Sequence, residues 1–181
     1  MNKPQGYDEA QAYTGDFEAL KLGGHICKII DAVEGTTQNG HGYLDILFDI
    51  VEGDQAGYYA KRFEEMNKNG QAKWQGTYRQ FTGGNSTPYF KGMIENIEKS
   101  NLGYKFNFNE KTLIGKLFGG VFGREQYKNQ QGEIKFATKC RTIRTVEAIR
   151  EGVEIPEDKL LPTEQNNEFF SPVSDDDELP F

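Results

Sequence analysis

The alternation of residues 44–50 constrains the fold of this chain more than any other stretch. Apolar side chains occupy every second position, and Asp45, Leu47 and Asp49 fall between them. This two-residue period predicts a β-strand with one buried face. Residues 25–33 predict a strand before it, and residues 58–63 predict a third strand after it. Because turn-forming stretches at 34–42 and 52–57 separate them, we expect an antiparallel meander.

A helix is predicted after this meander. Residues 64–82 fit either a hairpin tip or an excursion from the sheet. Thr87 is a candidate capping residue, and Pro88 suits the first helical position. Apolar side chains then recur at helical spacing, at Phe90, Met93, Ile94 and Ile97. The helix is expected to end near residues 100–103.

The chain then predicts a hairpin. Glycines interrupt the apolar run 113–124 too often for a helix, so we expect a strand there, followed by a polar turn at 125–132 and a last strand over 133–146. One face of that strand carries Ile134, Phe136, Thr138 and Cys140, and the other carries Lys135, Lys139 and Arg141.

Five strands with a helix between the third and fourth are the element order of the OB-fold, a mainly β, five-stranded Greek-key barrel. We therefore expect an OB-fold domain over residues 21–150, preceded by an N-terminal arm over 1–20. In that fold the second and third strands, with the 1–2 and 4–5 loops, form a platform for oligonucleotides. Those loops would be residues 34–42 and 125–132. No internal repeats are present.

Charge divides the chain into two parts. Residues 151–181 hold ten acidic side chains and one lysine, a net charge of −9, whereas residues 1–150 hold 20 basic and 18 acidic side chains, a net of +2. The acidic part is punctuated by Pro156, Pro162 and Pro172, and we expect a linker and protein-interaction tail there. The low overall isoelectric point therefore says little about the surface of the folded part.

Several classes of protein are excluded or disfavoured. Two cysteines, Cys27 and Cys140, provide neither a disulfide framework nor a zinc site, and His25 with Cys27 is more often a packing pair than a metal site. No cofactor or metal is expected. Neither a membrane-spanning apolar run nor a signal region is present, so we expect a soluble protein in the cytoplasm of a host bacterial cell. Gly120–Gly123 matches a KH-type GXXG only literally, since its flanks predict strand.

Aromatic and basic side chains are interleaved where the OB interpretation places its binding groove. Sequence-tolerant binding of a single strand needs flat rings for base stacking and positive charge for phosphates. The candidate residues for single-stranded DNA are Tyr58, Tyr59, Lys61, Arg62, Lys73, Trp74, Tyr78, Arg79, Arg124, Tyr127, Lys128, Lys135, Lys139 and Arg141. Trp74, Tyr78 and Arg79 are the strongest, because they lie in a polar stretch without apolar periodicity. The alternative for each ring is a place in the core or in a cross-strand pair.

The last eleven residues, 171–181, form an acidic run that ends on Leu-Pro-Phe. Such a segment buries too little apolar surface to order itself, so we expect it to be disordered and available to partners. The pattern resembles the C-terminal tip of bacterial and phage single-stranded-DNA-binding (SSB) proteins. The resemblance implies that Asp175, Asp176, Asp177, Glu178, Leu179, Pro180 and Phe181 bind replication, recombination and repair proteins. An ordinary solvated acidic tail is the alternative.

The body is also similar to small SSB-like OB-fold proteins of phages and prophages, over residues 25–29, 47–53 and 116–127. This resemblance implies a non-enzymatic protein that coats and protects single-stranded DNA in phage replication and recombination. The long Gly/Gln-rich linker of bacterial SSB proteins is missing, so their tetramer is not carried over, and a homo-oligomer stays open. The alternative is an OB-like adaptor of such a complex that does not touch DNA. A metal-dependent nuclease is remote.

Overall fold

The computed structural model describes residues 18–67 and 70–162. Within these ranges the chain forms a five-stranded antiparallel sheet in the order β3-β2-β1-β4-β5. Its elements are β1 (Gly23–Thr36), β2 (Gly42–Ile50), α1 (Tyr58–Met66), β3 (Thr77–Phe81), η2 (Gly84–Ser86), α2 (Thr87–Ser100), η3 (Glu110–Leu113), β4 (Leu117–Lys128), β5 (Ile134–Arg144) and α3 (Val146–Glu151). The predicted mainly β fold, with a helix between the third and fourth strands, is confirmed.

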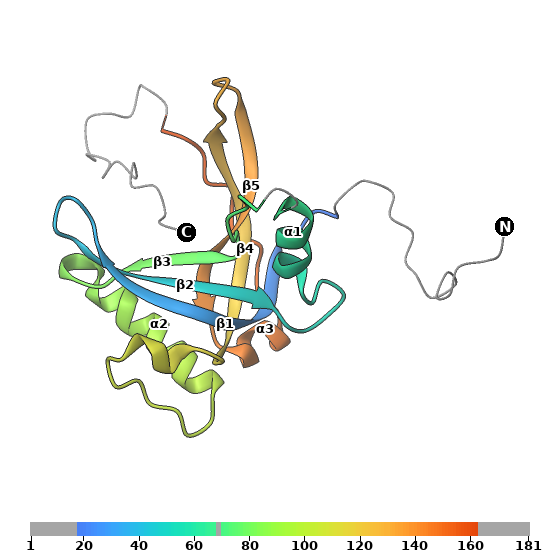
Figure 1. Ribbon diagram of the computed structural model, residues 1–181. Coiled ribbons are helices and arrows are strands. Elements are labelled where there is room, and N and C mark those ends of the chain that lie inside the picture. The colour runs from blue at the N-terminus through green and yellow to red at the C-terminus, as the bar shows by residue number, and fades with distance from the viewer. Residues whose placement is uncertain (1–17, 68–69, 163–181) are drawn as a thin grey trace, which may run out of the picture.

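Strand β1 organises the sheet because it pairs on both sides. It runs beside β2 along most of its length, while its first residues, Gly23–Lys28, pair with β4. Figure 1 shows β1, β2 and β3 as one layer, with β4 and β5 crossing it and α2 below. The enclosed core is built on Phe48, whose ring meets those of Phe118 and Phe122 edge to face at 5.3 and 6.0 Å.

Residues 58–63 were predicted as a strand, and this prediction is wrong: they begin helix α1. The helix has no capping side chain of its own. Instead, the carboxylate of Asp49, at the end of β2, accepts hydrogen bonds from the backbone N–H groups of Tyr59 (2.9 Å) and Ala60 (3.1 Å). These are N–H groups that a helix start leaves without an intrahelical partner. A contact from another element therefore decides a local conformation that the aromatic residues did not indicate.

We expect Asp49→Ala to lower the free energy of unfolding by about 1–2 kcal/mol, because it removes the acceptor for the first turn of α1. Urea denaturation followed by circular dichroism measures the change. Asp54→Ala is the matched control, since Asp54 is an exposed aspartate whose ion pair with Lys21 lies at the surface, and it should cost less than about 1 kcal/mol. Equal stability of the Asp49 variant and the wild type would contradict this role.

The third strand lies in the stretch that the sequence left open, at Thr77–Phe81. Three boundaries also differ from the prediction. Strand β1 continues to Thr36, so the predicted 34–42 loop is shorter, and β4 continues to Lys128, so the polar turn begins at Asn129 rather than at residue 125. Helix α2 is confirmed, but it begins at Thr87 itself with Ser86 as the N-cap residue.

The acidic segment begins as part of the fold, not as a linker. After α3, the backbone of Lys159 pairs in parallel with the outer edge of β4. Its N–H donates to the Arg124 carbonyl (2.9 Å) and its carbonyl accepts from the Gln126 N–H (2.8 Å). The folded part therefore reaches at least to Lys159, beyond the boundary expected at residue 151. Residues 163–181 lie outside the described residues.

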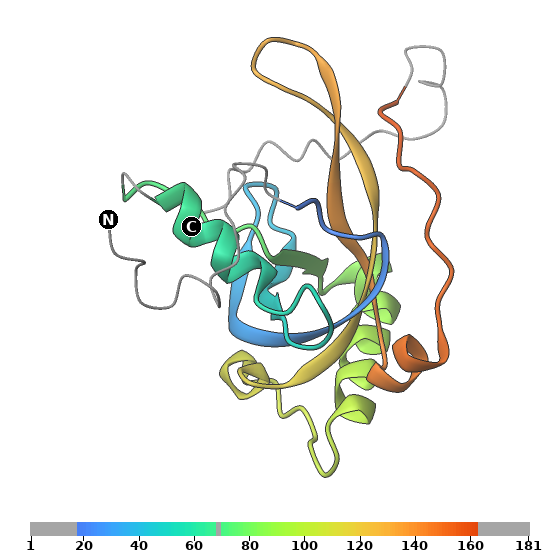
Figure 2. The same cartoon turned by 90° about the vertical axis from the view of Figure 1, so that its right-hand side faces the viewer.

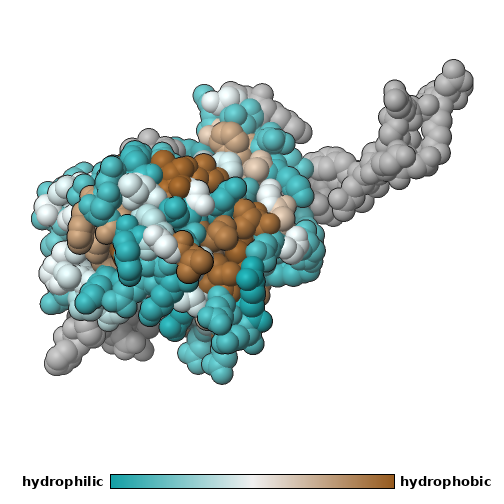
Figure 3. Space-filling view, turned by 90° about the horizontal axis from the view of Figure 1, so that it is seen from below, coloured by the Kyte–Doolittle hydropathy of each residue, from teal (hydrophilic) through white to brown (hydrophobic). Residues whose placement is uncertain are grey.

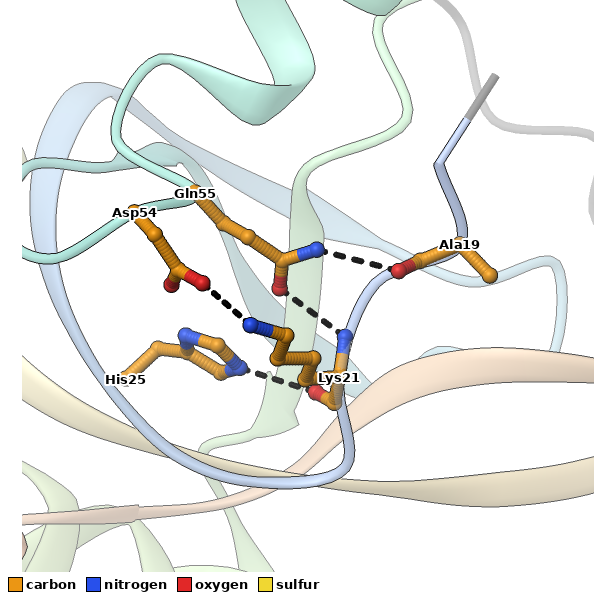
Figure 4. Close-up of polar contacts among 5 residues, drawn as sticks. All are labelled: Ala19, Lys21, His25, Asp54 and Gln55. Atoms are coloured by element: carbon orange, nitrogen blue, oxygen red, sulfur yellow. Dashed lines mark hydrogen bonds and ion pairs between the residues drawn. The ribbon is translucent and has the colours of Figure 1, made fainter. Parts of the chain in front are cut away.

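Residues 18–20 of the predicted N-terminal arm also belong to the fold, since Leu20 is buried in the core. Figure 4 shows how the buried Gln55 holds the chain here: its Nε2 donates to the Ala19 carbonyl (3.0 Å) and its Oε1 accepts from the Lys21 N–H (2.9 Å). Lys21 forms an ion pair with Asp54, and His25 Nε2 donates to the Lys21 carbonyl (2.8 Å). This polar clamp fixes the entry into β1.

Candidate nucleic-acid interface

The β4–β5 hairpin is the most cationic exposed element of the fold. Residues 124–141 contain five basic and two acidic side chains. Beyond Phe122 the hairpin leaves the sheet, because β1 begins at Gly23 and no longer accompanies it. Figure 2 shows it projecting from the body, with its tip far from α2. The exposed lysines of such a projecting, positively charged ribbon can contact phosphates.

The register of the hairpin gives each face a ring and cations. Opposite pairs share a face in an antiparallel ladder. The pairs Tyr127–Lys135 and Gly123–Lys139 lie on one face, and the pairs Lys128–Ile134 and Gln126–Phe136 lie on the other. Tyr127 is 43% exposed and Phe136 is 45% exposed. Both faces therefore present an aromatic ring beside lysine, the combination that stacking and phosphate contact require.

The guanidinium of Arg124 is already engaged. It forms a bidentate pair with Asp158 (2.9 and 2.6 Å) and lies 5.0 Å from the centre of the Phe136 ring. The hydrogen bond to Asp158 raises the pKa of Arg124. Arg141 donates to the Arg124 carbonyl at 3.3 Å. The lysines at 128, 135 and 139 are exposed, and of these Lys135 is 3.3 Å from Glu133.

Arg79, one of the three strongest sequence candidates, is held inside the fold. Its guanidinium donates two hydrogen bonds to the buried carboxylate of Asp45 (2.7 and 2.8 Å) and stacks on the Tyr43 ring at 3.7 Å. Arg79 and Asp45 are direct cross-strand partners in β3 and β2. Because this pair already satisfies the arginine, a phosphate contact would have to compete with a buried carboxylate.

The other two strong candidates have structural contacts as well. The Trp74 indole donates to the Phe48 carbonyl (3.1 Å) and its ring lies 5.6 Å from that of Phe63. Tyr78 packs against the core, and desolvation raises its pKa to about 12. Neither ring is fully buried. Both rings are positioned by the fold rather than presented freely to solvent.

The remaining candidates lie on or near α1. The Tyr59 ring is buried against Phe48 at 5.5 Å, and Tyr58 packs edge to face on Tyr59. Arg62 donates to the Gln75 side chain at 2.5 Å, whereas Lys61 and Lys73 are exposed. The structure therefore does not bring all the candidates together on one surface. It separates an α1 group from the hairpin group.

Sequence reasoning missed a groove of about 600 Å³ between the β1–β2 loop and the turn before α2. It is lined by Gly40, His41, Gly42, Phe81, Gly83, Gly84, Asn85 and Ser86. Phe81 lies opposite Tyr43 in the ladder, and the two rings meet edge to face at 6.4 Å. The glycine-rich composition of both loops could have indicated this groove, since backbone without side chains lets a ligand approach closely.

Other kinds of site find little support in the described ranges. No group of three or more histidine, cysteine, aspartate or glutamate side chains there is placed to hold a metal ion. Both cysteines are buried, and burial raises the pKa of the Cys140 thiol to about 12. Within residues 18–67 and 70–162, no helix has the length and apolarity needed to cross a bilayer.

A separate apolar surface lies at the opposite end of the molecule. Figure 3, which views the protein from below, shows apolar groups gathered on this face. The loop after α2 exposes Leu102 and Phe108, and Ile114 is also exposed. The backbone of Phe108 has a positive φ of 62°, which residues other than glycine rarely adopt. Lysines accompany these residues too, but Lys105 and Lys111 form ion pairs with Glu98 and Asp31, and Lys116 lies over the Tyr104 ring, so we leave this surface out of the interface.

Comparison with models of known protein families finds no match to this chain, and comparison with curated proteins also finds none. The function must therefore be argued from the residues and their arrangement.

Proposed function

We propose that this protein binds single-stranded DNA without sequence preference and without catalysing a reaction, and that it does so in phage DNA replication and recombination. The observation that carries the proposal is the projecting β4–β5 hairpin, on which exposed lysines alternate with half-exposed rings. Stacking on rings tolerates any base, and contacts to phosphates tolerate any sequence. A duplex hides the faces of its bases, so such a ribbon favours single strands.

We propose in addition that the fold is an OB-fold. The first strand pairs with both the second and the fourth, β3 contacts β5, and α2 lies between β3 and β4 in the chain. These features fit a partly open five-stranded barrel. In Figure 1 the hairpin rises on the side away from α2, whereas the β1–β2 loop lies beside the turn that precedes α2. They would be the two loops that flank an oligonucleotide in this fold.

Residues 175–181 extend the proposal to partners, although they lie outside the described residues. An acidic run followed by Leu-Pro-Phe suits a pocket that combines an apolar floor with a basic rim. We propose that this segment recruits replication or recombination enzymes to the bound strand.

The direct test is fluorescence anisotropy with labelled oligo-dT of increasing length, at several salt concentrations. We expect binding that tightens with length and weakens steeply with salt, and much weaker binding to a duplex of the same length. A labelled oligo-U series distinguishes DNA from RNA. Absence of binding to every oligonucleotide at low salt would reject the proposal and favour the adaptor alternative.

Tyr127→Ala should weaken oligo-dT binding by about 1–3 kcal/mol, roughly 5- to 150-fold, because it removes one stacking ring. Anisotropy at constant salt measures the loss. Tyr89→Ala is the matched control: Tyr89 is another exposed tyrosine, but it lies in the first turn of α2. Equal losses in the two variants would show that the hairpin ring has no special role.

A further inference from the structure

The backbone of the hairpin has two outer edges, and only one of them is satisfied within the described chain. On the β4 edge, the carbonyl of Arg124 and the N–H of Gln126 point outward and bond to Lys159. Their cross-strand partners are Thr138 and Phe136. In an antiparallel ladder, opposite residues that point away from each other form the non-hydrogen-bonded pairs. The N–H and C=O groups of Phe136 and Thr138 therefore point away from β4, at the opposite edge.

By the same two-residue period, Ile134 also points its backbone groups to this edge. Within residues 18–67 and 70–162, no backbone hydrogen bond reaches the outer edge of β5 at these positions. The side chains of Ile134 and Phe136 are 57% and 45% exposed. An uncovered edge strand with apolar side chains is a template for pairing with another strand.

We propose that this edge pairs with the same edge of a second copy of the chain. The arrangement is antiparallel, with a twofold axis at Phe136, so that Phe136 meets Phe136 of the other copy and Ile134 meets Thr138. All the outward N–H and C=O groups then find acceptors and donors. The two Phe136 rings meet, and Ile134 of each copy lies beside Thr138 of the other on the same face, as aromatic and β-branched cross-strand pairs do in stable sheets.

Charge selects this register. With the axis at Phe136, Glu133 of one copy lies opposite Lys139 of the other, twice, and Lys135 lies opposite the neutral Ala137. Glu133–Lys139 is a non-hydrogen-bonded pair, in which side chains come closest. A shift of the pairing by two residues in one direction sets Lys135 against Lys139. A shift in the other direction sets Lys135 against Lys135. Like charges directly opposite each other are destabilising, so of these three registers only the one centred on Phe136 is free of repulsion.

The projection of the hairpin makes this pairing sterically open. Figure 2 shows the β4–β5 ribbon standing clear of the body, with the segment after α3 on its other side. Two such ribbons side by side join the two five-stranded sheets into one continuous sheet. This inference does not depend on nucleic-acid binding, because the interface is built from protein backbone and is tested without DNA.

The test exchanges the charges. Glu133→Lys and Lys139→Glu are prepared separately and as an equimolar mixture, and association is measured by sedimentation velocity without DNA at about 150 mM salt. We expect a concentration-dependent dimer of the wild type. Each single variant should dimerise about ten-fold more weakly, because two opposite-charge pairs become like-charge pairs. The mixture should regain the dimer, because a lysine at position 133 of one chain then faces a glutamate at position 139 of the other.

Matched controls make the same charge changes on α2, with Glu95→Lys and Lys91→Glu, and these should leave the dimer unchanged. Circular dichroism establishes that every variant is folded. Wild type that remains monomeric up to about 100 μM, roughly −5.5 kcal/mol of association, would overturn the proposal. Single variants that associate like the wild type, or a mixture that stays monomeric, would also overturn it.

Discussion

Arg79→Met should destabilise the protein by about 3–5 kcal/mol, the largest effect on stability that we expect from a single polar side chain. Asp45 is buried, and the two hydrogen bonds from Arg79 are the partners of its carboxylate. Methionine keeps most of the apolar length of arginine but removes the charge and the donors. The cost arises because a buried carboxylate is left without compensation. Urea denaturation measures the change in the free energy of unfolding.

Arg124→Met provides the control, since Arg124 makes the same bidentate contact with Asp158 at the surface. The arginine side chain is 50% exposed there, against 19% for Arg79. An exposed pair contributes up to about 1 kcal/mol. The double variant Asp45→Leu/Arg79→Met should recover part of the loss, because an apolar pair replaces the orphaned charge. Equal effects of the two single arginine variants would show that burial of Asp45 does not decide the cost.

Replacing Lys128, Lys135 and Lys139 together with glutamine should weaken oligo-dT binding by about 100-fold at 0.1 M salt. Each phosphate contact with a single strand contributes about 0.7 to the slope of log affinity against log salt concentration. The loss of three contacts lowers the magnitude of this slope by about 2. Because 0.1 M is one tenfold step below 1 M, a slope difference of about 2 corresponds to a loss of about 100-fold in affinity at 0.1 M salt. Anisotropy titrations between about 0.05 and 0.5 M salt give both quantities.

A second triple variant, Lys91, Lys99 and Lys105 to glutamine, makes the same change in net charge on α2 and the loop after it. It should leave the salt slope close to that of the wild type, because these lysines lie at the other end of the molecule. If both triple variants lost affinity equally, net charge rather than the hairpin would govern binding. An unchanged slope in the hairpin variant would place the phosphate contacts elsewhere.

Most of the strands could be predicted, because their periodicity is local. The alternation at 44–50 and the glycine-interrupted apolar run at 113–124 each predicted a strand that overlaps the observed β2 and β4. Helix α2 followed from Pro88 and the apolar spacing behind it. Helix α1 could not be predicted in this way. Its two tyrosines favour strand, and the carboxylate that caps it comes from Asp49, in another element.

The surroundings of the candidate side chains were predicted less well, for a related reason. Residues 73–80 carry polar neighbours, so their rings were expected at the surface. Gly76 changes this, because a Cβ there would lie 2.2 Å from the Phe48 carbonyl. Because Gly76 has no side chain, the backbone just before β3 can lie close to β2, and the Trp74 indole then reaches the Phe48 carbonyl. The exposure of the hairpin side chains could be predicted, because a two-stranded ribbon has little interior and its composition alone indicates what it exposes.

The parallel pairing of Lys159 with β4 also limits how far Phe181 can lie from the hairpin. The polypeptide leaves the body beside the hairpin, and Phe181 follows only 19 residues after Pro162. Even a fully extended chain of that size spans no more than about 65 Å. A partner that binds Phe181 would therefore stay within that distance of the β4–β5 hairpin, wherever along a nucleic-acid strand the protein is bound.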